Sequence, residues 1–268
     1  MATIQTDMNG LEYVLIDGER RYLTCLPPKD DSGFQKFQAG RTIPRGEWRE
    51  VDNEPYLTAI KDQNGRGACV GHGSVTALEV AINQAGRTKR QLSAWFCYSQ
   101  INGGMDNGAV VSDALQSLKQ TGTCLDSSVK YATYIKSQIS QSAYTEAERF
   151  KVKEGYQLTT FDELASAIQL GFTISFGICI GGRFSPNSDG IIPQWNGQNT
   201  GGHCMAGLGL KQINGKWYVK VANSWGTNWG KGGWCFMDES YFTGQRYGLD
   251  AFAIEAAAHD PQDPGLTV

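Results

Sequence analysis

The stretch QNGRGACVGHGSVTALEVAINQAG, residues 63–86, decides the fold because it predicts a helix with a thiol at its entrance. Apolar residues recur at helical spacing from Val75 to Ile82, and Gly86 follows where glycine commonly ends a helix. Cys69 stands before this run. The N-H groups and dipole of a helix N-terminus favour a thiolate, so Cys69 is the candidate nucleophile. The small residues around it leave donors free for an oxyanion.

A thiol nucleophile needs a base, and the sequence offers three histidines. His259 lies in a polar tail. His72 follows Cys69 by one helical turn, which leaves little room for a substrate carbonyl between them, so we interpret it as structural. His203 opens an apolar strand behind two glycines in TGGHCMAGLGL, where an imidazole can face a cleft. Asn223 ends the strand KWYVKVAN and could accept the imidazole N-H, although an asparagine at this position is most often a turn residue.

The rest of the chain separates into a helix-rich and a strand-rich half. Further helices are predicted after Ser93, after Ser112 and after the capping box that begins at Thr160. From Phe172 onward, FTISFGICI, HCMAGLGLK, KWYVKVAN and GGWCFM predict strands, and Asn214–Gly215 predicts a hairpin turn. Segregated helices and strands indicate an α+β arrangement of two lobes, with a substrate site between them.

Three segments resemble the papain family of cysteine peptidases: IKDQNGRGACVGHGSVTALE, GGHCMAGLGL and WYVKVANSWGTNWGKGGW. The order Gln, Cys, His, Asn and the spacing from Gln63 to Cys69 also match that family. The resemblance covers about Ile43 to Glu255. It implies a papain-like two-lobed α+β fold, with a helical N-terminal lobe at about residues 60–160. An antiparallel β-rich C-terminal lobe follows at about residues 161–255, with the active-site cleft between the lobes.

The resemblance also implies roles for individual residues. Cys69, His203 and Asn223 correspond to the family's catalytic residues, and Gln63 would donate to the oxyanion beside the Cys69 N-H. Trp225 would shield the hydrogen bond between His203 and Asn223 from water. From the sequence alone, Trp225 and Trp229 could equally be ordinary core aromatics.

The predicted substrate contacts come from three places in the chain. The segment DNGAVVSDALQ resembles the strip that pairs with the extended substrate backbone, which implicates Asn107, Gly108 and Ala109. Trp229 would line the leaving-group side. Gly201 and Gly202 precede His203, and their lack of side chains predicts a roomy second subsite. This wall of the subsite would not select substrates by charge.

Two departures from the family pattern have structural meaning. Val70 replaces the tryptophan that usually follows the nucleophile, and Arg66 and Asp106 stand where the family has two disulfide-bonded cysteines. We hypothesise that Arg66 and Asp106 form an ion pair in place of that disulfide; two independent solvated charges are the equally simple alternative. The lack of these cysteines resembles the bacterial and phage members of the family.

Composition excludes several classes of protein. A net charge of -3, from 24 basic and 27 acidic residues, does not suit a protein that neutralises many phosphates, so we expect no nucleic-acid partner. Seven cysteines without a close C-x-x-C pair argue against a disulfide framework and a zinc site. Neither a signal peptide nor a membrane span is predicted, so we expect no membrane partner and a cytoplasmic location, with release by lysis or packaging in a particle left open.

These observations predict a cysteine endopeptidase domain at residues 43–255 that acts on peptides or proteins and needs no metal or other cofactor. Residues 1–42 are predicted to be an N-terminal extension, and a short prosegment, a brace between the lobes and a docking element all remain open. Residues 256–268 are predicted to be a flexible tail. The competing functions are a catalytically silent structural or binding protein, an amide acyltransferase and a cell-wall amidase.

Overall fold

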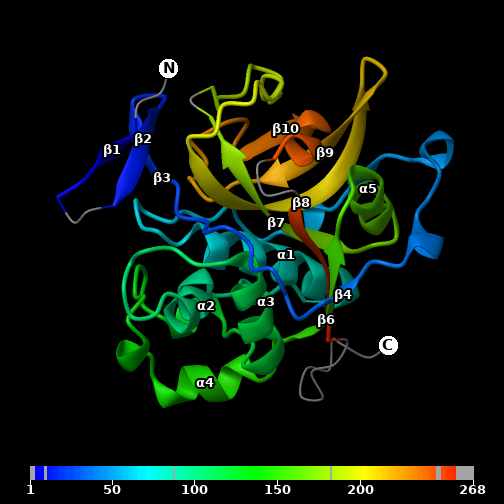
Figure 1. The fold of residues 1–268 in the computed structure, drawn as a ribbon. Coiled ribbons are helices and arrows are strands. Elements are labelled where there is room, and N and C mark those ends of the chain that lie inside the picture. The colour runs from blue at the N-terminus through cyan, green and yellow to red at the C-terminus, as the bar shows by residue number, and fades with distance from the viewer. Residues whose placement is uncertain (1–3, 9–10, 87, 182, 246–248, 258–268) are drawn as a thin grey trace.

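The computed structural model describes residues 4–8, 11–86, 88–181, 183–245 and 249–257, which form a helical lobe and a sheet lobe (Figure 1). The α-helices are α1 (Cys69–Ala85), α2 (Ala94–Ile101), α3 (Val111–Gln120), α4 (Gln141–Ala147), α5 (Phe161–Gln169) and α6 (Ser240–Thr243). Short 3-10 helices span Ala39–Arg41, Arg45–Glu47, Glu54–Tyr56, Asp126–Ser128 and Lys136–Gln138. None of the helices in the described residues has the length and apolar character needed to cross a membrane.

The strands form one large sheet and one small sheet. The large sheet has the order β10-β9-β8-β7-β11-β6-β4, with β5 paired to β8. Its pairings are antiparallel except between β4 and β6. Its strands are β4 (Gln35–Lys36), β5 (Val51–Asp52), β6 (Val152–Leu158), β7 (Thr173–Ile180), β8 (Gly201–Ile213), β9 (Lys216–Ala222), β10 (Trp234–Asp238) and β11 (Asp250–Ala256). The predicted two-lobed α+β class is therefore confirmed.

Local signals explain where most of these elements begin and end. Ser93 caps α2 by accepting the Phe96 N-H, and Thr160 forms the predicted capping box with Glu163 at α5. Asn214–Gly215 turns β8 into β9 with positive φ at both residues. The predicted cap at Ser112 is wrong. The chain stays extended up to residue 110 and α3 starts at the next residue, so Ser112 lies inside the first turn.

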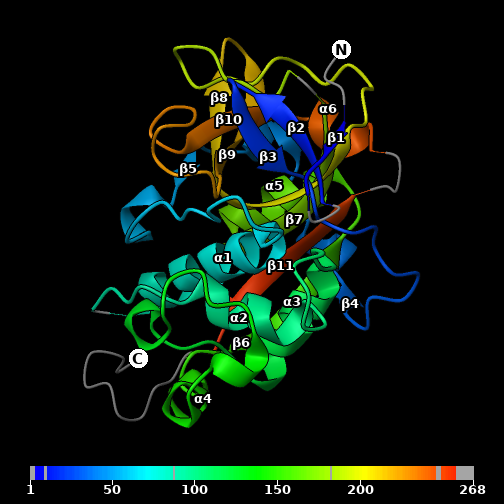
Figure 2. The same ribbon diagram turned by 90° about the vertical axis from the view of Figure 1, so that its left-hand side faces the viewer.

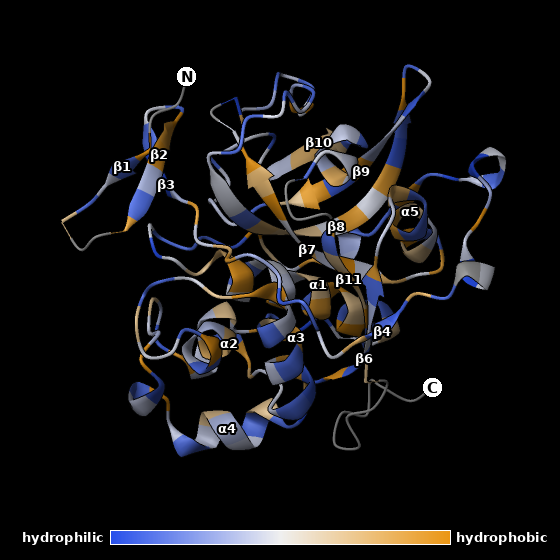
Figure 3. Cartoon of the chain, in the orientation of Figure 1, coloured by the Kyte–Doolittle hydropathy of each residue, from blue (hydrophilic) through white to orange (hydrophobic). Residues whose placement is uncertain are grey.

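Helix α1 lies at the centre of the molecule, between the sheet lobe and the helices α2, α3 and α4 (Figure 2). It is buried on every side, as expected for a helix with little polar surface (Figure 3). The charged exception is Glu79, whose carboxylate accepts from Lys61 Nζ at 2.7 Å, from Thr58 and from the Leu92 N-H. This fully bonded pair fixes α1 to the chain that leads up to the active site.

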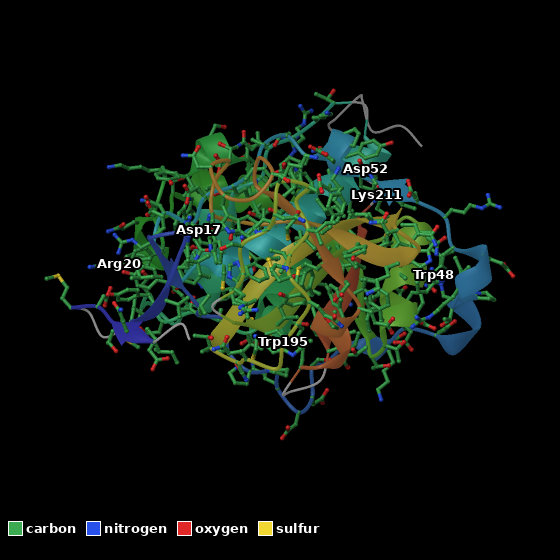
Figure 4. The ribbon with its side chains drawn as sticks, turned by 90° about the horizontal axis from the view of Figure 1, so that it is seen from above. Asp17, Arg20, Trp48, Asp52, Trp195 and Lys211 are labelled. Atoms are coloured by element: carbon green, nitrogen blue, oxygen red, sulfur yellow. The ribbon has the colours of Figure 1, made fainter. Side chains whose placement is uncertain are left out.

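The N-terminal residues form a small sheet of β1 (Gln5–Thr6), β2 (Glu12–Ile16) and β3 (Glu19–Tyr22). The turn residue Asp17 accepts from Ser185 Oγ at 2.7 Å, and the Arg21 guanidinium lies 4.9 Å from the centre of the Trp225 ring. Asp17 and Arg20 lie on the opposite side of the molecule from Trp48 (Figure 4). The hairpin therefore attaches to the sheet lobe and directs the following residues towards α1.

Candidate active site

Cys69 is the first residue of α1, as the sequence predicts, and its side chain is completely buried. Burial raises the pKa of the thiol, although hydrogen bonds with the Cys204 main chain and with Thr24 oppose this effect. The direction is opposite to the one expected from the helix entrance alone. The reason is that Thr24, from the N-terminal segment, covers the sulfur, with Oγ1 at 3.7 Å from Sγ.

His203 and Asn223 are joined by a hydrogen bond of 2.7 Å between Nε2 and Oδ1. The Ser224 N-H also donates to Oδ1 of Asn223, at 2.7 Å. A backbone N-H can only donate, so this atom is an acceptor and Nε2 of the histidine must carry the proton. Nδ1 is then the basic nitrogen, and it has no hydrogen-bond partner in the described part of the chain. Burial lowers the pKa of His203 to about 4.

The Trp225 ring stacks on this imidazole, with centroids 4.6 Å apart. Trp225 is buried and thus covers the hydrogen bond between His203 and Asn223. Trp229 contacts Trp225 edge-on at 5.3 Å and stacks on Phe184, and it is only 2% exposed. In this state Trp229 is therefore part of the aromatic core behind the site.

Gln63 is hydrogen-bonded to Ser224, the residue that follows Asn223 in the chain. Its Oε1 accepts from Ser224 Oγ at 2.8 Å, and its Nε2 donates to the Arg66 carbonyl at 2.7 Å. An amide nitrogen carries two hydrogens, so one remains for another acceptor. The Gln63 amide is thus fixed by hydrogen bonds at both its oxygen and its nitrogen, with one N-H to spare.

An N-terminal segment, residues 23–28, occupies the groove between the lobes. Its Cys25 N-H donates to the Gly202 carbonyl of β8 at 3.0 Å, and its Leu26 N-H donates to the Ala109 carbonyl at 2.9 Å. The Ala109 N-H donates in return to the Thr24 carbonyl at 3.3 Å. These bonds join the segment to both lobes, and we call this place the interlobe groove.

Two glycines allow this close approach. A Cβ at Gly108 would lie 1.9 Å from the Thr24 carbonyl oxygen, and one at Gly202 would lie 2.0 Å from the Cys25 carbonyl oxygen. Gly108 also has a φ of +87°, which other residues rarely adopt. Of the predicted substrate strip, Gly108 and Ala109 thus face the groove, whereas Asn107 is exposed and its amide contacts Met105.

Arg66 and Asp106 form the hypothesised ion pair, with Nη1 and Oδ2 separated by 3.7 Å. Arg66 is 41% exposed and Asp106 is 10% exposed. Asp106 makes firmer bonds through its other oxygen, which accepts from the Gly67 N-H at 2.9 Å and from the Tyr98 hydroxyl at 2.8 Å. The main non-covalent link between these two loops is therefore Asp106 to Gly67.

The remaining candidates are accounted for as follows. His72 Nδ1 donates to the Ala68 carbonyl at 2.9 Å, the ring packs edge-on against Trp95, and burial lowers its pKa to about 4, so its structural interpretation is confirmed. His259 lies outside the described residues. The seven cysteines are all described and form no disulfide. No cluster of metal-binding side chains occurs within the described ranges.

Sequence reasoning missed Thr24 and Cys25 as components of the site. The turn-rich Pro-Pro sequence that follows them was the available signal, because it predicts an extended chain. It carries no information on where that chain docks.

A two-lobed fold with a thiol at the entrance of its central helix and a histidine on the facing strand defines a thiol peptidase. The chain belongs to the papain family of cysteine proteases, because the sequence profile described as "Papain family cysteine protease" matches residues 44–254.

Individual relatives agree with this assignment. The chain is 29% identical to cysteine endopeptidase Rep1 of Oryza sativa subsp. japonica over 249 residues, which cover 89% of this chain and 63% of the rice protein. It is 25% identical over 229 residues to an uncharacterized peptidase C1-like protein of Acanthamoeba polyphaga mimivirus, covering 77% of this chain and 73% of the viral protein. Its fold is similar to xylellain, a cysteine protease from Xylella fastidiosa, with a TM-score of 0.73 at 19% identity over 87% of this chain and 95% of xylellain.

Proposed function

We propose that this protein is a cysteine endopeptidase in which Cys69 is the nucleophile and His203 the general base and acid. The observation that carries the proposal is the hydrogen bond from His203 Nε2 to Asn223, which leaves Nδ1 as the basic nitrogen. The main chain of the next residue, Cys204, contacts the Cys69 thiol. Thiol and imidazole therefore belong to one local site.

In the proposed reaction, His203 Nδ1 takes the Cys69 proton and the thiolate attacks a peptide carbonyl carbon. The oxyanion receives hydrogen bonds from the Cys69 N-H and from Gln63 Nε2. His203 returns the proton to the leaving amine as the C-N bond breaks, which leaves a thioester on Cys69. His203 then takes a proton from water, whose oxygen attacks the thioester carbonyl carbon. The C-S bond breaks, His203 returns the proton to sulfur, and the acid and the free thiol are released.

We further propose that the folded chain is latent, because residues 23–28 fill the interlobe groove. Thr24 presents its hydroxyl to the Cys69 sulfur, while its carbonyl oxygen accepts from Ala109 on the opposite wall. The Thr24 carbonyl is therefore not positioned for attack, and the segment blocks the site without being a substrate there. The contacts support the prosegment role, and they brace the lobes at the same time.

The test is treatment with an epoxide thiol trap, followed by mass spectrometry of each cysteine. Opening of the groove should limit both reactions, but Cys69 should still be labelled faster than the other six thiols, and a denatured protein substrate should be cleaved slowly by the native sequence and not at all by Cys69→Ala. Equal labelling of all seven thiols would refute the proposal that Cys69 is the nucleophile of an enzyme. Labelling of Cys69 with transfer to an added amine, in place of hydrolysis, would identify an acyltransferase instead.

A further inference from the structure

Asp250, the first residue of β11, is a buried carboxylate that the proposed reaction does not use. It is 6% exposed, and its Oδ2 has no hydrogen-bond partner among the described residues. Burial raises the pKa of this carboxyl to about 7. A buried acid without a partner costs free energy, so its position calls for a reason.

The position of Asp250 is next to the interlobe groove. It pairs with Gly177 of β7, where a Cβ would lie 3.2 Å from Asp250 Oδ2 and 2.7 Å from Cys25 Sγ. The missing side chain of Gly177 thus opens a space that the Cys25 side chain enters. Because Cys25 is held by its main chain to Gly202, any extended peptide on the same path directs one side chain towards Asp250.

The space continues as a pocket of about 390 Å³. Glu12 and Asp250 both line it, and none of the described residues that line it is lysine, arginine or histidine. Gln245 also lines the pocket, but its amide is already engaged. Its Oε1 accepts from the Cys179 N-H at 2.6 Å, and its Nε2 donates to the Tyr241 carbonyl at 2.7 Å. Asp250 Oδ2 is therefore an acceptor available to a ligand, in acidic surroundings.

We propose that Asp250 is a specificity-determining residue that selects substrates with lysine or arginine at the position that Cys25 occupies in the groove. The inference rests on the proposed peptidase function. A long basic side chain extends beyond the reach of Cys25 and brings N-H donors to the unpartnered oxygen. The thiols of Cys25 and Cys204 and the exposed carboxylate of Glu12 also face this region. Glu12 belongs to the N-terminal region that a substrate displaces. Asp250 is therefore the carboxylate that remains in the pocket when a substrate is bound.

The test uses the full-length chain and peptidyl vinyl sulfones that carry arginine, citrulline or leucine at each residue position in turn. Citrulline has nearly the shape of arginine without its charge. The N-terminal segment competes with every trap alike, so the ratio of Cys69 labelling rates is the readout. At one position, arginine should react about 10- to 100-fold faster than citrulline, as a charge-assisted hydrogen bond implies.

Asp250→Asn should reduce this ratio to about one, and Glu12→Gln, at the exposed acid of the same pocket, should preserve it. A ratio near one in the native sequence at every position would overturn the inference, whether or not the variants fold. So would a ratio that survives in Asp250→Asn. In either case, labelling of Cys69 would leave the peptidase function intact, whereas failure of every trap to label Cys69 would refute both.

Discussion

Cys25→Pro should open the interlobe groove, because proline removes the N-H that donates to the Gly202 carbonyl and places a ring carbon against it. The lost bond costs about 1 kcal/mol, and crowding the carbonyl and leaving it unpaired costs about 1–2 kcal/mol more. A total of about 2–3 kcal/mol corresponds to a roughly 30- to 150-fold larger open fraction. The rate at which an epoxide labels Cys69 should rise by that factor, until the groove is mostly open.

The matched control is Cys25→Ala, which keeps the N-H and removes only the thiol from the pocket beside Gly177. Its loss of buried surface is worth about 1 kcal/mol, so labelling of Cys69 should rise by less than about tenfold. If the proline and alanine variants are labelled at the same rate, the bond to Gly202 does not hold the groove closed, and the latency argument is refuted.

The pH profile of labelling gives an independent readout of the same event. The thiolate is the reactive form, and burial raises the pKa of Cys69 in the closed state. Opening removes that burial and lowers the pKa, so the thiolate appears at lower pH. The midpoint of the Cys25→Pro profile should therefore lie below that of the native sequence. A midpoint that moves upward would contradict burial as the cause.

Three further predictions concern single contacts. Asn223→Ala removes the acceptor that orients the imidazole and should slow peptide cleavage about 5- to 30-fold, measured as kcat/KM, for about 1–2 kcal/mol. Glu79→Ala leaves the buried Lys61 ammonium unpaired and should lower the free energy of unfolding by about 3–5 kcal/mol in urea titration. Asp106→Ala should destabilise more than Arg66→Ala, and the double variant should show a coupling of at most about 1 kcal/mol.

Each of these has a result that would contradict it. Full activity in Asn223→Ala would mean that the Trp225 stack alone orients the ring. For Glu79, the control is Lys153→Ala at the exposed pair with Glu255, which should leave the free energy of unfolding nearly unchanged. Equal losses at the buried and exposed pairs would refute the buried-charge argument. Strictly additive losses of stability in the Arg66 and Asp106 variants would mean that this ion pair contributes nothing to the free energy of unfolding.

The sequence predicted the parts of the site whose signals are local. The helix entrance at Cys69, the cap at Ser93 and the turn at Asn214–Gly215 each depend on residues close in the chain, and the structure has them as predicted. The predicted cap at Ser112 failed because the chain before α3 is held extended by partners in the groove, which is a tertiary effect.

The docking of residues 23–28 could not be predicted for a related reason. The segment is held mainly by its own main-chain N-H and carbonyl groups, which every sequence has, and it fits because each wall of the groove presents a glycine to it. Gly202 therefore gave an incomplete signal. It indicated an open wall, but only the structure shows that the space admits the Cys25 carbonyl. Asp250 was equally hidden, since an acid at the start of a strand is an ordinary sequence feature.

The raised pKa of the buried Cys69 thiol connects two effects of residues 23–28. The segment blocks access to the sulfur, and it also favours the protonated form of the thiol. Under the segment, burial favours the neutral thiol of Cys69 and the neutral imidazole of His203, so no ion pair is expected while Thr24 covers the sulfur. When the segment is displaced, water enters the site and removes the burial that disfavours the Cys69 thiolate and the His203 imidazolium. The helix N-terminus then favours the thiolate. Because binding and ionisation are linked, whatever stabilises the thiolate must also favour release of the segment. In the proposed latent state, the segment therefore controls both access to the sulfur and its chemical reactivity.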